Sequence, residues 1–167
     1  MELHLNVARW GHRQTDWLAA AVCGLAAGAV LMVVELFWAA LVSPDSPWTT
    51  SRAIAAILIG REVLQSPGFD VGVMAMALFT HYVLGVFFGL ALGALLAQFA
   101  SEWDLPEMMI TGVLFGAALY LLNFYGMAQV FPWFGALRGW PAFVGHLIFG
   151  ASAALIYWKL ERRSTDR

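Results

Sequence analysis

Four long apolar stretches, almost free of charge, constrain the fold of this chain more than any other feature. Residues 71–100, 108–137 and 139–158 contain no Asp, Glu, Lys or Arg, and residues 17–43 contain only Glu35. Each stretch reaches the ~20 apolar residues that a helix needs to cross the ~30 Å hydrocarbon core of a bilayer. Because the backbone must satisfy its own hydrogen bonds in lipid, these stretches are predicted to be helices. The sequence therefore predicts an all-α integral membrane bundle with transmembrane helices near 17–42, 71–98, 107–131 and 139–159.

The composition agrees with a membrane location and excludes several classes of protein. Hydrophobic residues make up 61% of the 167 residues and charged residues 12%, whereas a soluble domain has ~45–50% and ~25%. A net charge of −2 provides no basic surface for nucleic acid, and the single cysteine, Cys23, permits no intrachain disulfide. The sequence contains no nucleophile–base motif, phosphate loop or dinucleotide fingerprint. We expect one transmembrane domain over residues 1–167, without enzymatic activity, in contact with the lipid bilayer.

The Lys and Arg residues near the ends of the spans predict their orientation. Six of them fall on the side of the two chain ends and three fall on the other side: Arg9, Arg13, Lys159, Arg162, Arg163 and Arg167 against Arg52, Arg61 and Arg138. Since Lys and Arg accumulate on the cytoplasmic side, both termini are predicted to be cytoplasmic. The first apolar stretch is also far longer than the ~7–15 residues of a signal-peptide core, which predicts a retained helix.

A shorter amphipathic segment is predicted between the first and second spans, over residues 50–65. Its apolar centre, residues 53–60, is too short to cross a bilayer, so we expect a helix that lies in the membrane interface. Its apolar side is expected to carry Ile54, Ile57, Leu58 and Leu64, with Arg52, Arg61, Glu62 and Gln65 elsewhere. The alternative is a lid over whatever the bundle encloses.

Small residues recur on every predicted span at a spacing of four residues, or of five between Gly145 and Gly150. They are Gly24 and Gly28 on the first span, Gly85, Gly89 and Gly93 on the second, Gly112 and Gly116 on the third, and Gly145, Gly150 and Ala154 on the fourth. Helices in lipid associate through close backbone approach, which small residues permit. The spacing therefore predicts a tightly packed bundle.

One polar side chain on each span shares a helix face with these small residues: Glu35, His81, Asn123 and His146. Residues four or seven positions apart lie on one face of a helix, so all four are expected to point inward. A rise of 1.5 Å per residue places all four ~10–15 Å from the predicted outer ends of the spans. We expect one intramembrane cluster in the outer half of the bilayer, which Thr80, Tyr120, Tyr125 and Gln129 extend.

Three interpretations of this cluster remain open. It can be a hydrogen-bond network that fixes the register of the helices. It can be a proton or ion site, because glutamate and histidine in lipid are typical of proton relays. It can also ligate a cofactor, either b-type haem through His81 and His146 or a metal ion through both histidines and Glu35. The second interpretation gives a proton- or ion-linked membrane protein. The alternative function is an accessory subunit that packs against other subunits of a larger respiratory or photosynthetic membrane complex.

Several short motifs carry a resemblance to a known family. They are Thr80-His81 with an aromatic residue, Phe88, two turns later; Gly145-His146-Leu147; the basic tail from Lys159 to Arg163; Gly24-Leu-Ala-Ala-Gly28; and Ser46-Pro47. In these motifs the chain resembles the YagU-like family of small bacterial inner-membrane proteins. Glu35 lies about one turn from the position where the family's acidic residue is expected. The resemblance implies a bacterial inner-membrane location and a connection with acid tolerance, without a mechanism.

Overall fold

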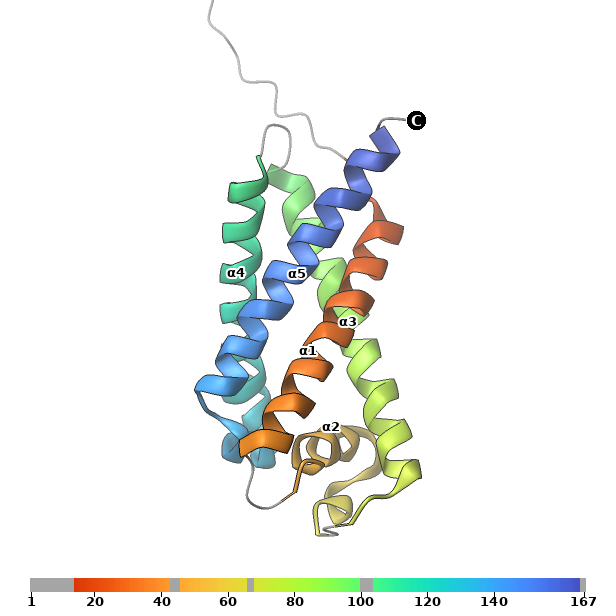
Figure 1. The fold of residues 1–167 in the computed structure, drawn as a ribbon, viewed down its shortest axis with the longest axis vertical. Helices are drawn as coiled ribbons and strands as arrows, with labels where there is room; N and C mark the ends of the chain where they lie inside the picture. The colour runs from red at the N-terminus through yellow and green to blue at the C-terminus, as the bar shows by residue number, and fades with distance from the viewer. Residues whose placement is uncertain (1–13, 43–45, 66–67, 100–103, 166–167) are drawn as a thin grey trace, which may run out of the picture.

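The computed structural model describes residues 14–42, 46–65, 68–99 and 104–165, and these ranges are helical throughout apart from short connections. Four helical spans are long and apolar enough to cross a membrane. The regular α-helices in them are α1 (Trp17–Val42), α3 (Val71–Phe99), α4 (Leu105–Leu121) and α5 (Trp140–Thr165). A shorter helix, α2 (Thr49–Ile59), lies between the first and second spans (Figure 1). The predicted fold, four spans with a short helix between the first two, is confirmed.

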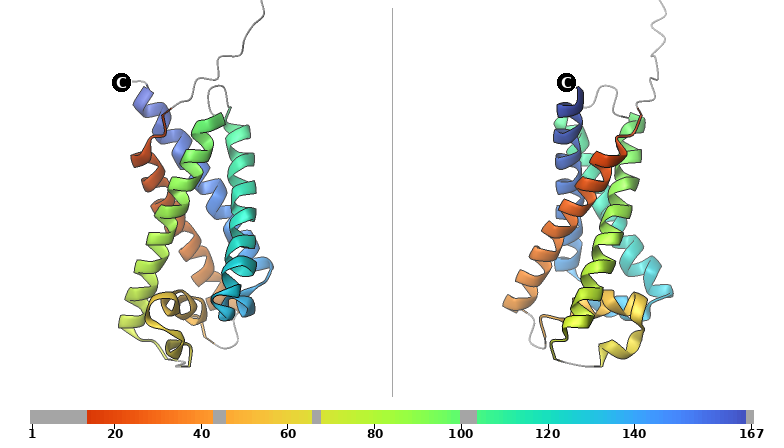
Figure 2. Two further views of the ribbon diagram at one scale, coloured as in Figure 1. Left: turned by 180° about the vertical axis from the view of Figure 1, so that it is seen from behind. Right: turned by 90° about the vertical axis from the view of Figure 1, so that its right-hand side faces the viewer.

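The spans run antiparallel, so α1 begins and α5 ends at the same end of the bundle (Figures 1 and 2). The opposite end holds α2, which lies crosswise under the spans where α1 ends and α3 begins. The orientation in the membrane stays a prediction. Of the basic residues that predict it, Arg9, Arg13 and Arg167 lie outside the described residues, as do the side chains of Arg162 and Arg163.

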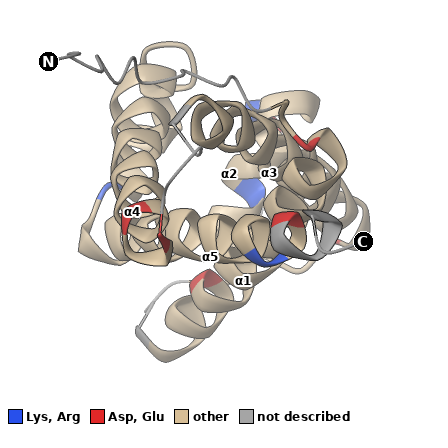
Figure 3. Cartoon of the chain, turned by 90° about the horizontal axis from the view of Figure 1, so that it is seen from above, with Lys and Arg blue, Asp and Glu red and all other residues tan. Residues whose placement is uncertain are grey.

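The two central helices are α1 and α5. Helix α1 packs against α3 on one side and α5 on the other, and α5 packs in turn against α4, whereas α3 and α4 touch only slightly. The spatial order α3–α1–α5–α4 therefore differs from the order along the chain. Viewed along the bundle axis, most of the ribbon is uncharged (Figure 3), as a lipid environment requires.

Helices α1 and α3 meet through glycines. A Cβ atom added to Gly89 would lie 2.5 Å from the Ala20 carbonyl oxygen and 2.5 Å from the Gly24 Cα atom. Carbon atoms in contact are normally ~3.5–4.0 Å apart, so no larger residue fits at Gly89 without separating the helices. The backbone of α1 consequently lies directly on the backbone of α3.

Helices α4 and α5 meet in the same way. A Cβ atom on Gly116 would lie 2.9 Å from the carbonyl carbon of His146, and one on Gly150 would lie 2.9 Å from the carbonyl carbon of Gly112. On the other face of α5, a Cβ atom on Gly145 would lie 2.9 Å from the Leu31 side chain of α1. The predicted tight packing through small residues is thus confirmed on all four spans.

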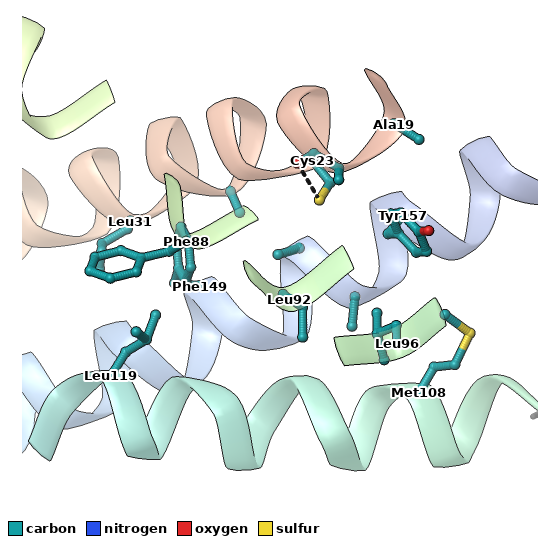
Figure 4. Packing of buried hydrophobic residues seen from close by; sticks show 14 residues of the cluster. Ala19, Cys23, Leu31, Phe88, Leu92, Leu96, Met108, Leu119, Phe149 and Tyr157 are labelled. Atoms are coloured by element: carbon teal, nitrogen blue, oxygen red, sulfur yellow. Dashed lines mark hydrogen bonds between the residues drawn. The ribbon is translucent and has the colours of Figure 1, made fainter. Parts of the chain in front are cut away.

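The core between the spans is built mainly from small or aliphatic side chains. Some of the larger apolar side chains are buried in this core and others lie on the outer surface of the bundle. Ala20, Cys23, Ala27, Ala153 and Ala154 are fully buried, together with Leu92, Leu96 and Tyr157 (Figure 4). The Cys23 thiol donates a hydrogen bond to the Ala20 carbonyl, 3.1 Å away. Many large apolar side chains point outward, among them Leu18, Val33, Phe37, Phe79, Phe87 and Leu114. Such an exterior suits contact with lipid chains.

The third span departs from the predicted continuous helix over 107–131. Regular α-helix ends at Leu121, and a π-helical turn η2 (Leu122–Gly126) follows, then the 3₁₀ turns η3 (Met127–Gln129) and η4 (Pro132–Leu137). The Arg138 Nε atom donates to the carbonyl of Phe124 at 2.7 Å, which stabilises the wider turn. The other spans match their predicted bounds more closely, except that α5 continues to Thr165, beyond the predicted end at 159.

The segment predicted over 50–65 consists of α2 and the 3₁₀ turn η1 (Arg61–Leu64), separated by Gly60 with a φ of 94°. Leu58, on the apolar side of this segment, is 55% exposed, whereas Arg52, on another side, is buried. The reason is that the Arg52 guanidinium donates a hydrogen bond to the carbonyl of Gly68, so its charged head lies inside the fold.

Candidate intramembrane polar site

A cavity of about 70 Å³ lies between the four spans at the end where α2 lies. All four spans contribute to its wall, and α2 contributes Thr50, Ile54 and Ile57. Its polar side chains are Glu35, Thr50, His81, Asn123 and His146, and most of the remaining wall is Leu and Phe. This central cavity has room for a few water molecules. The four side chains that the depth count placed at one level therefore line one cavity.

His146 and Asn123 form the direct side-chain contact within this set. The Asn123 Nδ2 atom lies 3.1 Å from His146 Nε2, and His146 Nδ1 lies 2.8 Å from the Ala142 carbonyl oxygen. A carbonyl oxygen can only accept, so Nδ1 carries the hydrogen, and Nε2 of the neutral ring accepts from the Asn123 amide. The Asn123 Oδ1 atom is buried and, within the described residues, has no hydrogen-bond partner.

His81 bonds to the backbone of α1 instead of to the other polar side chains. Its Nε2 atom lies 2.8 Å from the Gly28 carbonyl oxygen and must be the donor, which leaves Nδ1 of the neutral ring as an acceptor. A Cβ atom on Gly28 would lie 3.6 Å from His81 Nε2, an ordinary contact distance. His81 therefore joins α3 to α1 while its ring stays on the wall of the cavity.

Glu35 has no partner within the part of the chain that the structure describes: its carboxyl makes no hydrogen bond and no ion pair there. The half-buried Glu35 side chain lines the central cavity and two larger cavities beside it. Thr50 also lines all three cavities. The α1–α5 side cavity, about 390 Å³, includes Ser46, Thr49 and Arg138 in its wall. The α1–α3 side cavity, about 380 Å³, lies between α1, α2 and the start of α3.

The expected extensions of the cluster do not line the central cavity. The Thr80 hydroxyl donates to the Met76 carbonyl at 2.8 Å, and the Gln129 amide donates to the Tyr125 carbonyl at 3.3 Å. The Arg138 guanidinium lies over the Tyr125 ring, with 4.4 Å between its Cζ atom and the ring centroid. Tyr120 comes closest, since its ring meets the edge of the His146 ring with 6.1 Å between centroids.

Sequence reasoning missed two residues near the site, Thr50 and Arg138. Thr50 lines all three cavities because α2 is held across the end of the bundle. The Trp133 indole Nε1 donates to the Ala53 carbonyl at 3.0 Å, which ties α2 to η4. If residues 50–65 act as a lid over the bundle, as the alternative prediction stated, Thr50 is expected at the site. No feature of the sequence around Arg138 indicates that its side chain lies beside the third span.

The residues of the site do not fit the cofactors considered from the sequence. Among the described residues, no three His, Cys, Asp or Glu side chains gather as a metal ion would require. A porphyrin is many times larger than the central cavity of about 70 Å³. The Nε2 atoms of both histidines are also engaged in hydrogen bonds, so axial ligation of haem by His81 and His146 does not match this arrangement.

Comparisons of the chain with protein-family models, with curated proteins and with solved structures find no match. The resemblance to the YagU-like family stays a prediction from short motifs.

Proposed function

We propose that this four-span membrane protein is a bacterial inner-membrane protein that binds and releases protons at Glu35 and the neighbouring histidines, in a role linked to acid tolerance. One observation carries the proposal: a carboxyl group without a partner in the described chain faces a cavity that it shares with two histidines and whose wall is otherwise mostly apolar. Ionisable residues within membrane spans are costly and generally functional. Glutamate and histidine within membrane spans are typical of proton relays, so the proton is the ion that we propose.

The α1–α5 side cavity supports a route for protons to Glu35 from the end of the bundle that holds α2. Ser46, Thr49 and Thr50 give this cavity polar groups that can hydrogen-bond water. Arg138 lies on the same wall, and its positive charge raises the energy of any cation that enters this cavity. The hydroxyl groups and the water that they can bind are therefore the contacts through which a proton would reach Glu35.

The other half of the bundle is closed by apolar packing, which argues for a proton site open to one face instead of a channel. Leu92, Leu96 and Met108 are almost completely buried there, and Tyr157 fills the space beside them (Figure 4). A proton taken up at Glu35 would remain in the half of the membrane that holds α2. Its effect would be to change the charge of the cavity, as in a sensor or a coupling site.

Infrared spectroscopy of the purified full chain tests this proposal. The stretching band of a protonated carboxyl in apolar surroundings should disappear as the pH is raised, and Glu35→Gln should remove that band. Glu62→Gln is the matched control, because Glu62 is an exposed carboxylate outside the three cavities. A pH-dependent band that persists in Glu35→Gln, or no such band in the wild type, would contradict the proposal.

A further inference from the structure

The α1–α3 side cavity has a composition that the proton site does not require. Its wall is largely apolar, with Met32 and Met74 on opposite helices and the ring pair Trp48–Phe69, whose centroids lie 5.1 Å apart. A space of about 380 Å³ is within the ~300–1,000 Å³ range of small-molecule pockets. We propose that this cavity binds a lipophilic monocation, such as a hydrophobic amine or a quaternary ammonium or phosphonium ion, with Glu35 as its counter-ion.

Charge complementarity carries the choice of ligand. Glu35 is the one Asp, Glu, Lys or Arg among the described residues that line this cavity. A carboxylate in apolar surroundings is costly without a partner, and small cations lose too much hydration to enter. A cation whose charge is spread over an apolar body loses little hydration and pairs with the carboxylate directly.

The side chains around Glu35 suit such a ligand. Aromatic faces attract cations that have lost their water, and Trp48 provides the ring type that does so best. Met32 and Met74 are flexible and adapt to apolar ligands of different shape. Phe69 and Leu78, on the same wall, are 62% and 40% exposed, so the cavity is accessible from the surrounding lipid or interface.

This inference rests on the proposed function in one respect: Glu35 must release its proton before the cation binds, so the two compete. The titratable or charged groups that line the three cavities, among the described residues, are Glu35, His81, His146 and Arg138. Arg138 faces the α1–α5 side cavity and opposes cation binding there. His81 lies on the wall of the α1–α3 cavity, and its protonation in acid would further weaken binding.

The test is equilibrium dialysis of tetraphenylphosphonium against the purified full chain in mild detergent. We expect saturable binding of one ion per chain at neutral pH, at least tenfold weaker binding in Glu35→Gln, and unchanged binding in the control Glu62→Gln. Ala75→Phe narrows the α1–α3 cavity and should weaken binding. Ala39→Phe narrows the α1–α5 cavity instead and should leave it unchanged.

A second measurement needs no variant. In the wild type, saturating tetraphenylphosphonium should diminish the infrared band of the protonated Glu35 carboxyl at a fixed pH. Absence of saturable binding while that band still titrates would overturn the cation site and leave the proton site intact. Equal affinity in Glu35→Gln, or loss of binding only in Ala39→Phe, would overturn it too. A wild type whose Glu35 band does not titrate would instead refute the proposed function.

Discussion

Alanine substitution of two glycines one turn apart, Gly24 and Gly28, should have opposite consequences for the stability of the bundle. A Cβ atom at position 24 would lie 2.8 Å from Gly89 Cα and would overlap the Gly85 carbonyl oxygen, both of them backbone atoms that cannot rotate away. A Cβ atom at position 28 would lie 3.6 Å from His81 Nε2 and 3.9 Å from Gly85 Cα, both ordinary contacts. The first substitution must separate α1 from α3, whereas the second fits.

The intrinsic effect of replacing glycine by alanine in a helix is the same at both positions, a gain of ~0.5–1 kcal/mol. This gain is therefore equal in the two variants, and the difference between their free energies of unfolding reflects only the cost of the steric overlap at position 24. Overpacking of this kind costs ~1–3 kcal/mol, so the free energy of unfolding of Gly24→Ala should fall below that of Gly28→Ala by ~1–3 kcal/mol. Gly28→Ala itself should be as stable as the wild type or slightly more stable.

Unfolding in mixed detergent micelles, with increasing dodecyl sulfate and tryptophan fluorescence as the signal, measures this difference. Gly28→Ala serves as the matched control, since it changes the same helix by the same atoms. Equal losses in the two variants would show that the spacing of small residues, and not the closest backbone contact, determines stability. A larger loss in Gly28→Ala would refute the packing of α1 on α3 described above.

Three further outcomes are expected. A double-mutant cycle with Asn123→Leu and His146→Leu should give a coupling of ~0.6 kcal/mol and at most ~1.7 kcal/mol, the average and the maximum for hydrogen bonds between membrane helices. Purely additive losses would contradict the bond between these side chains. Trp133→Phe removes the donor to α2, so hydrogen exchange of the α2 amides should accelerate; an unchanged rate would mean that other contacts hold α2. A reporter active only in the cytoplasm should be active after Arg167 and silent near residue 45, and the reverse pattern would overturn the predicted orientation.

The spans could be predicted from the sequence because the bilayer imposes a simple requirement. Long uncharged stretches must become helices in lipid, and this requirement fixes their number and approximate position. The π turn at Leu122–Gly126 could not be predicted, since its stabilising donor, Arg138, approaches from a later part of the chain. The burial of Arg52 escaped prediction for the same reason: its acceptor is the Gly68 carbonyl.

The four polar residues of the spans were predictable as a set, but Thr50 of α2 and the hydrogen-bond partners of the four were not. Depth along a helix follows from residue number, so counting places Glu35, His81, Asn123 and His146 at one level. Their hydrogen bonds depend on which backbone carbonyls come within reach once the helices pack. His81 bonds to the carbonyl of Gly28 because glycine contacts bring α3 onto α1, a relation between residues 53 positions apart.

The spatial order α3–α1–α5–α4 has a consequence for biosynthesis. Helix α1 contacts α3 and α5, and both emerge from the ribosome after it. The residue pair that completes the cavity, Asn123 with His146, follows Glu35 by roughly 90–110 positions, an interval on the order of 5–20 s at ~5–20 residues per second. During that interval the glutamate lies in a membrane without its final surroundings. Helices α4 and α5, by contrast, are neighbours in the chain and can pair as a hairpin as soon as both are inserted.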